Sequence, residues 1–294
     1  MNDISDYLYR ELRQIPFNIY DLISKYIESN NDTKVAFVGG YIRDLLITKV
    51  HKQVFPKPVD IDIVIEGSSV ALAKFIKQNI SNVEICLIKE LKLYNTVELN
   101  INDLKIDIAS ARKEIYSAPG LNPKVINATI EEDLQRRDFT INAIAFEVST
   151  KKVYDLYQGI QDIKGKELHL LHESSIADDP SRLIRCAKYA TRLGFNISRE
   201  SLKQSQATVS KWPWKTSKNQ DKIIFPPAIS IRIRMELSEI YKYDNLNKVI
   251  PLLEKWEIIS ILNKNIQVIN AGISGSWSEQ EVKLVKNKTK KRTL

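Results

Sequence analysis

The chain has 294 residues, with 44 lysines and arginines against 36 acidic residues, so its formal net charge is +8. This length predicts about two domains, and a hydrophobic fraction of 43% excludes a wholly disordered chain. Two cysteines, Cys86 and Cys186, exclude a disulfide framework, and no apolar run approaches the roughly 20 residues that a membrane span needs.

The first half of the chain alternates patterns typical of helices and strands. The N-terminus contains acids and no stretch suited to a signal peptide, so we expect a cytoplasmic protein without a membrane partner. Residues 4–30 are predicted to form one polar amphipathic helix. The segments that follow are a strand, VAFVGG (35–40), a helix start, YIRDLLI (41–47), a strand, VDIDIVIEG (59–67), a helix, SSVALAKFIKQN (68–79), and three strands, VEICLIKE (83–90), YNTVELNI (94–101) and KIDIASA (105–111).

The second half has a different pattern. From about residue 176 apolar residues recur at helical spacing and the strand patterns stop. Residues 211–228, KWPWKTSKNQDKIIFPPA, contain three prolines and predict a linker or irregular loop. We therefore predict an α+β chain, with a mixed-sheet head over residues 1–155 and an all-helical region over residues 156–294.

The excess of basic residues favours a polyanionic partner, because lysine and arginine neutralise phosphates. It is uneven: residues 283–294, KLVKNKTKKRTL, hold six basic residues and no acid. We interpret this stretch as a solvated tail in preference to a specific RNA contact. His51, His169 and His172 are the only histidines, and the i,i+3 spacing of the last two does not by itself indicate zinc.

Two aspartates mark the first candidate site. In a strand, residues i and i+2 point to the same face, so Asp60 and Asp62 project together. Paired carboxylates suit Mg²⁺, which takes oxygen ligands from one or two carboxylates and from substrate phosphates. The alternative is an exposed edge strand with two solvated acids. Asp107 on a later strand is either a third carboxylate at this site or a partner of Arg112.

Three further motifs suggest nucleotide contacts. Gly39 and Gly40 join a strand to a helix, where backbone N–H groups favour phosphate, although a tight turn explains them equally well. The segment RRDFTINA (136–143) offers groups for triphosphate and ribose, or a surface salt-bridge cluster. In DDPSR (178–182), Asp178 resembles a helix N-cap. Asp179 and Arg182 are spaced for an intrahelical ion pair or for contacts with a base edge.

Together, in this order and spacing, the motifs GG-x-x-R-D, D-I-D, R-R-D-F-T-I-N-A and D-D-P-x-R-x-x-R resemble those of a known family. The chain is similar over residues 20–200 to the class II tRNA nucleotidyltransferases (CCA-adding enzymes) and bacterial poly(A) polymerases, of the polymerase-β-like superfamily. RRDFTINA is the most specific piece. The resemblance implies a nucleotidyltransferase head followed by a helical neck and body.

The resemblance also implies residue roles. Asp60 and Asp62 correspond to the ligands of a catalytic Mg²⁺. Nucleotide contacts are implied for Gly39, Gly40 and Arg43 (triphosphate), for Arg137 and Asp138 (ribose) with Asn142 beside them, and for Asp179, Arg182 and Arg185 (base). Asp155, Gly159 and Asp162 correspond to a flexible motif between head and neck.

The implied activity is template-independent addition of C and/or A to the 3′ end of tRNA, from CTP and ATP, with release of pyrophosphate. A poly(A) polymerase is the nearest alternative, and an RNA-binding protein without turnover is an alternative of another class.

Asp178 and Gln158 depart from the usual Glu and Gly of the family, and 294 residues are fewer than is typical. Full tRNA binding is therefore expected less strongly than the head chemistry, and no oligomeric state is indicated. A dinucleotide-binding oxidoreductase is disfavoured, because the third glycine of its fingerprint is missing.

Overall fold

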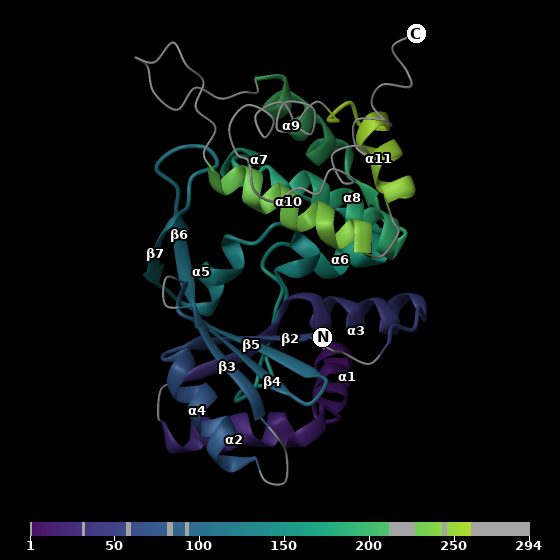
Figure 1. The fold of residues 1–294 in the computed structure, drawn as a ribbon. Helices are drawn as coiled ribbons and strands as arrows, with labels where there is room; N and C mark the ends of the chain where they lie inside the picture. The colour runs from purple at the N-terminus through teal and green to yellow at the C-terminus, as the bar shows by residue number, and fades with distance from the viewer. Residues whose placement is uncertain are drawn as a thin grey trace. The chain divides into compact units, whose positions relative to one another are not determined.

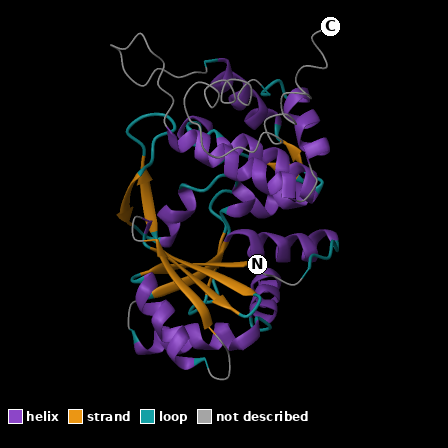
Figure 2. Ribbon diagram, in the orientation of Figure 1, coloured by secondary structure: helices purple, strands orange, loops and turns teal. Residues whose placement is uncertain are grey.

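The computed structural model describes residues 2–30, 33–56, 60–80, 85–91, 94–211, 227–242 and 246–259 (Figures 1 and 2). Within this described part the chain forms two compact units. The first comprises Met1–Ser117, Pro123–Ser175 and Gly194–Ser201, and the second Ala118–Asn122, Ile176–Leu193 and Leu202–Leu294. The boundary at residue 155 between head and helical region stays a prediction.

The first unit is built on a mixed sheet, as predicted. Among the described residues it has seven strands in the order β3-β4-β5-β2-β1-β8-β9. Their bounds are β1 Lys34–Val38, β2 Asp60–Glu66, β3 Ile85–Leu91, β4 Thr96–Ile101, β5 Leu104–Ser110, β8 Ala145–Glu147 and β9 Val153–Tyr154. Strands β2 and β5 pair in parallel, and the remaining described neighbours in this sheet pair antiparallel.

The predicted single helix over residues 4–30 is wrong, because the structure has two helices there. They are α1 Asn2–Leu12 and α2 Ile19–Ser29, separated by a 3-10 turn, η1 Pro16–Asn18. Proline lacks the N–H that a continuous helix requires. Phe17 and Asn18 also have φ values of 63° and 55°, outside the right-handed helical region.

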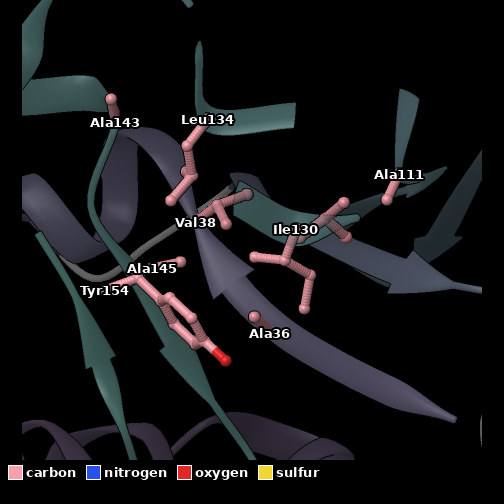
Figure 3. Packing of buried hydrophobic residues seen from close by; sticks show 9 residues of the cluster. Ala36, Val38, Ala111, Ile130, Leu134, Ala143, Ala145 and Tyr154 are labelled. Atoms are coloured by element: carbon pink, nitrogen blue, oxygen red, sulfur yellow. The ribbon is translucent and has the colours of Figure 1, made fainter. Parts of the chain in front are cut away.

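The two faces of the sheet are covered by different helices. Helix α2 packs against α4 Ser69–Asn79 and β1, and Tyr20 of α2 stacks on Phe37 of β1. Side chains alternate along a strand, so Ala36 and Val38 point to the opposite face. There they pack with Ile130 and Leu134 of α5 (Ile130–Gln135) and with Ala143, Ala145 and Tyr154 (Figure 3). This apolar cluster anchors the segment that contains the RRDFTINA motif.

Smaller elements complete the first unit. They are α3 Gly39–His51, β6 Arg112–Ile115 paired with β7 Lys124–Asn127, η3 Thr140–Asn142, α6 Gly159–Gly165, and β10 Glu167–Leu168 paired in parallel with β11 Asn196–Ile197. The short strands β10 and β11 contradict the prediction that residues 156–294 are all helical, and β11 also contradicts the expectation that strands stop near residue 176. Two residues are too few for the alternation that identifies a strand in sequence.

The second unit is helical in its described part, as predicted. It contains most of α7 Ser175–Asp178 and α9 Arg199–Ser210, and all of α8 Ser181–Leu193, α10 Pro227–Lys242 and α11 Leu246–Lys255. Helices α10 and α11 both pack on α8 (Figure 1), and Lys188 of α8 pairs with Glu236 of α10 at 2.6 Å. Most of the predicted linker at 211–228 and the basic tail at 283–294 lie outside the described residues. Among the described helices, none has the length and apolar character to cross a membrane.

Candidate active site

The predicted carboxylate pair lies on a central strand. Strand β2 is flanked by β1 and β5, so the alternative of an exposed edge strand is wrong. Asp62 lies opposite Val38 on β1 and opposite Asp107 on β5, and Asp107 in turn lies opposite Glu98 on β4. Directly opposite residues share a face of a sheet. Three carboxylates therefore form a row across β4, β5 and β2, on the face covered by α5, with Asp60 two residues from Asp62.

The row has unbalanced negative charge. Lys105 lies opposite Asp60, and its Nζ is 2.6 Å from Asp107, 3.6 Å from Glu98 and 3.7 Å from Asp60. Burial and the nearby Asp62 carboxylate nevertheless raise the pKa of Asp60 to about 6. Burial also raises the pKa of Asp107, although Lys105 opposes the shift. Like-charged carboxylates that repel in this way are stabilised by a cation held between them, so the donor set fits a divalent metal ion.

The contacts of Arg112 exclude one of the two roles that were predicted for Asp107. The guanidinium of Arg112 binds Glu114, the carbonyl oxygen of Tyr94 and Thr96 Oγ1. The alternative in which Asp107 pairs with Arg112 is therefore wrong. Asp107 lies opposite Asp62 on the same face of the sheet, and Lys105 Nζ is 2.6 Å from it.

Gly39 connects the carboxylates to the start of helix α3. Its φ is +74°, and a Cβ at this position would collide with Asp62 Oδ2 and lie 3.4 Å from Arg137 Nη1. Glycine adopts positive φ without a steric penalty and brings backbone close to other groups. The N-terminus of α3, Asp62 and Arg137 therefore meet at one point, and backbone N–H groups at this end of a helix favour an anion such as phosphate.

The Gly39→Ala variant is expected to lose about 2–4 kcal/mol of folding free energy, from left-handed backbone strain and the forced displacement of Asp62. Gly40→Ala is the matched control, since its Cβ would meet only Arg43 Nη2 at 3.5 Å. Because alanine favours helix, that variant should be unchanged or up to about 1 kcal/mol more stable. Urea denaturation of both variants measures the difference, and equal stabilities would contradict the crowding at Gly39.

The predicted Arg43 and Asn142 belong to one buried network. Arg43 is 2% exposed and donates from Nη1 to Asn142 Oδ1 at 2.8 Å and from Nε to Asp44 Oδ1 at 2.8 Å. Asn142 donates to Asp138 Oδ1 at 2.9 Å. Arg43 thus orients Asn142 and Asp138, and its predicted contact with a triphosphate stays a prediction.

Sequence reasoning missed Asp133, which holds both arginines of the RRDFTINA motif. Its carboxylate is fully buried, 2.7 Å from Arg136 Nη2 and 3.1 Å from Arg137 Nη2. Burial alone would raise the pKa of Asp133, but the two arginines outweigh it and lower the pKa. The alternative of a surface salt-bridge cluster is therefore wrong. The i,i+3 and i,i+4 spacing from Asp133 was the available signal.

A second group of predicted residues lies in the second unit. Asp179 is 8% exposed and accepts hydrogen bonds from Ser181 N at 3.1 Å and Ser181 Oγ at 2.7 Å. Asp179, and not the predicted Asp178, therefore caps the start of α8, because Asp178 ends α7. Arg185 lies 3.4 Å from the Asp179 carboxylate, while Arg182 is 4% exposed on the same helix.

Arg232 of α10 was not predicted, yet it lies 3.6 Å from Asp179 Oδ1. It also donates to the carbonyl oxygen of Leu121 at 3.2 Å. Burial would raise the pKa of Asp179, but Arg185, Ser181 and Arg232 together lower it, so the carboxylate stays ionised. No sequence signal identifies Arg232, because 53 residues separate it from Asp179 along the chain.

The predicted motif of Asp155, Gly159 and Asp162 packs onto η3. Asp155 caps α6 by accepting from Gly159 N at 2.6 Å. Thr140 Oγ1 donates to Asp162 Oδ2 at 2.5 Å, and a Cβ on Gly159 would collide with the Thr140 carbonyl. These contacts hold α6 close to η3, which carries Asn142.

Comparison with known proteins identifies the segment that carries this site. Residues 35–169 match the model of the poly A polymerase head domain. The matched segment, which is just under half of the chain, is similar to that head domain. This segment contains the carboxylate row, Gly39 and the RRDFTINA motif. The predicted resemblance to tRNA nucleotidyltransferases and poly(A) polymerases is thereby confirmed.

Curated relatives of the chain carry tRNA nucleotidyltransferase names. An A-adding tRNA nucleotidyltransferase of Aquifex aeolicus is 34% identical over 223 residues, which are 74% of this chain and 26% of the relative. A CC-adding tRNA nucleotidyltransferase of Deinococcus radiodurans is 34% identical over 183 residues, 59% of this chain and 44% of the relative. The chain thus spans less than half the length of these relatives.

Solved structures agree with the fold. An apo CCA-adding enzyme has a TM-score of 0.68 at 25% identity, covering 97% of this chain and 70% of that chain. A Thermotoga maritima CCA-adding enzyme complexed with tRNA has a TM-score of 0.60 at 26% identity, covering 92% and 55%. The predicted α+β class, a nucleotidyltransferase head followed by helices, is confirmed.

Proposed function

We propose that the protein is a template-independent nucleotidyltransferase that adds C and/or A residues to the 3′ end of tRNA. The observation that carries the proposal is the same-face pair Asp60 and Asp62 beside Gly39 at the N-terminus of α3. The head-domain match and the names of the A-adding and CC-adding relatives support it. CTP and ATP are the proposed substrates.

Mg²⁺ is the proposed metal, with Asp60 and Asp62 as its ligands. The two carboxylates offer oxygen donors, and Gly39 places no side chain against Asp62. Burial, and after it repulsion from Asp62, raise the pKa of Asp60 to about 6, and a dication relieves that repulsion. A bound Mg²⁺ supplies positive charge to the phosphoryl oxygens and to the attacking hydroxyl. Asp107, opposite Asp62 on the neighbouring strand, is proposed as a third carboxylate or as a support for the first two.

The remaining groups bind and orient the nucleotide. Gly39 and Gly40 present the N-terminal N–H groups of α3 to the triphosphate. Arg137 and Asp138 face the ribose, and Asn142, held by Arg43, orients Asp138. Taken by itself, the second unit offers an acceptor, the ionised Asp179, and the donors of Arg182 and Arg185, which are groups of the kind that pair with a base edge.

The proposed reaction is an in-line displacement at the α-phosphorus. The 3′-hydroxyl oxygen of the RNA forms the new bond to phosphorus, the bond to the bridging oxygen breaks, and pyrophosphate leaves. The hydroxyl proton passes to solvent, so no nucleophilic side chain is needed. Positioning and electrostatic stabilisation supply the catalysis.

An extension assay with Mg²⁺ tests the proposal on three tRNA transcripts, which end before CCA, after CC, and after complete CCA. CTP and ATP are supplied singly and together, and products are resolved at single nucleotides. We expect extension that stops at CC or CCA, which also shows which additions the protein performs. A long A tail on any RNA would replace the proposal by a poly(A) polymerase, and RNA binding without extension would leave a binding protein.

A further inference from the structure

A second group of potential metal ligands lies away from the carboxylate row. Asp162 on α6, Glu167 on β10 and His169 just after β10 each offer one ligand atom, and these atoms lie within 4.8 Å of one another. We call them the Asp162 cluster. Among the described residues it is the one group of three or more such side chains that meets this distance limit.

The spacing and donor types suit a transition metal. His169 Nδ1 lies 3.0 Å from Asp162 Oδ1, and His169 Nε2 lies 3.7 Å from Glu167 Oε2. One ion coordinates a single ring nitrogen, and here that nitrogen is Nδ1 beside Asp162. Ligands bound to one ion at about 2.0–2.2 Å are roughly 3–4 Å apart. One ligand atom of each of the three residues lies within 4.8 Å of the others, so rotation of the exposed Glu167 side chain toward Nδ1 completes the set. An imidazole with two carboxylates favours ions such as Zn²⁺, Co²⁺ or Ni²⁺ over Mg²⁺, which prefers oxygen ligands.

The ring nitrogen His169 Nδ1 lacks a hydrogen-bond partner among the described residues and is the atom that we expect to coordinate the ion. It is buried, and within the described part of the chain it has no hydrogen-bond partner, although Asp162 Oδ1 is near. The contact has the distance of an ion pair without the alignment of a hydrogen bond. Buried polar atoms rarely stay unsatisfied, and coordination to a cation would satisfy this nitrogen.

Hydrogen bonds from Thr140 hold Asp162 and His169 in place, whereas Glu167 is accessible to solvent. Thr140 Oγ1 donates to Asp162 Oδ2 at 2.5 Å, and Thr140 N donates to the carbonyl oxygen of His169 at 3.1 Å. Hydrogen bonds of this kind orient metal ligands. Glu167 is exposed, so an ion from solvent can reach the cluster. The pair His169 and His172 is not the site, since His172 Nδ1 lies 3.1 Å from Ser174 Oγ.

We propose that Asp162, Glu167 and His169 bind one divalent transition-metal ion, separate from the ion at Asp60 and Asp62. The bound ion joins α6 to the segment after it and, through Thr140, stiffens η3, where Asn142 lies. Its role is therefore structural, and the inference does not depend on the proposed transfer reaction.

Co²⁺ alone is the probe, titrated into the full chain carrying Asp60→Asn and Asp62→Asn, so that the carboxylate row does not compete. Visible absorption reports nitrogen and oxygen ligation, and calorimetry reports stoichiometry. We expect one equivalent to bind and to raise the Tm with increasing Co²⁺, because an ion that binds only the folded state stabilises it. No binding, or no rise in Tm, would overturn the proposal.

Glu167→Gln and His169→Gln, made in the same background, are expected to weaken Co²⁺ binding by at least about tenfold. His172→Gln is the matched control and should bind as the parent does. Circular dichroism without metal verifies that each variant is folded. Unchanged Co²⁺ affinity in His169→Gln, together with a lower Tm in the absence of metal, would show that His169 forms only an ion pair with the two carboxylates.

Discussion

Nucleotide incorporation by the Asp62→Asn variant is expected to fall by about a thousandfold, with the fold unchanged. Asp62 lies in the centre of the row, opposite Asp107 and against Gly39, so it is the carboxylate nearest the start of α3. Removal of its charge weakens the hold on a dication, which supplies several kcal/mol to phosphoryl transfer. Asparagine has the same shape, and it removes the repulsion that adds to burial in raising the pKa of Asp60, so stability should not decrease.

Single-turnover incorporation of radiolabelled CTP or ATP at saturating Mg²⁺, with the Tm of each protein, measures both effects. Asp60→Asn should lose activity to a similar extent. Asp103→Asn is the matched control, because Asp103 is an exposed acid at the turn between β4 and β5. Normal incorporation by Asp62→Asn would reject the assignment of the metal site. A large drop in Tm would mean instead that Asp62 is structural.

The Asp133→Asn variant is expected to lose about 3–5 kcal/mol of folding free energy, because it leaves Arg136 and Arg137 partly buried without their shared counter-ion. Asp133 is fully buried, so solvent cannot replace the lost interaction. Arg137 also donates to the carbonyl oxygen of Asn142, so the position of the proposed ribose-binding segment depends on the same pair. Incorporation should therefore fall as well.

Urea denaturation with a fluorescence readout measures this loss. Glu131→Gln is the matched control, since it removes an acid from the first turn of the same helix without an ion pair to either arginine. It should cost no more than about 0.5 kcal/mol. A loss below about 1 kcal/mol in Asp133→Asn would show that the two arginines find other partners.

The same carboxylate contributes to acid sensitivity. Because the two arginines hold the pKa of Asp133 below its ordinary value of 3.8, its stabilisation is complete above that pH. It is lost as the pH falls further, toward the lowered pKa of the folded state. The stability difference between the parent and Asp133→Asn should therefore narrow below about pH 4, as measured by denaturation at several pH values. A constant difference would contradict the assignment.

Local patterns in the sequence determined much of the head. Alternation along a strand predicted that Asp60 and Asp62 share one face. Gly39 and Gly40 marked the junction between the preceding strand and a helix. Such features depend on residues within one turn or one strand, so a short window of sequence contains them. Pro16 is also a local signal, because a proline at this position is sufficient to interrupt a helix.

Only the tertiary structure decided which groups surround these residues. The order β4-β5-β2-β1 brings Glu98 and Asp107 into line with Asp62, and this order is set by pairing between strands distant along the chain. The burial of Asp133 and Arg43 depends on what packs over them, and the contact of Arg232 with Asp179 depends on how α10 packs on α8. The sequence by itself determined which side chains share a face. Long-range packing determined which charges are buried together, because burial and strand order are properties of the whole fold.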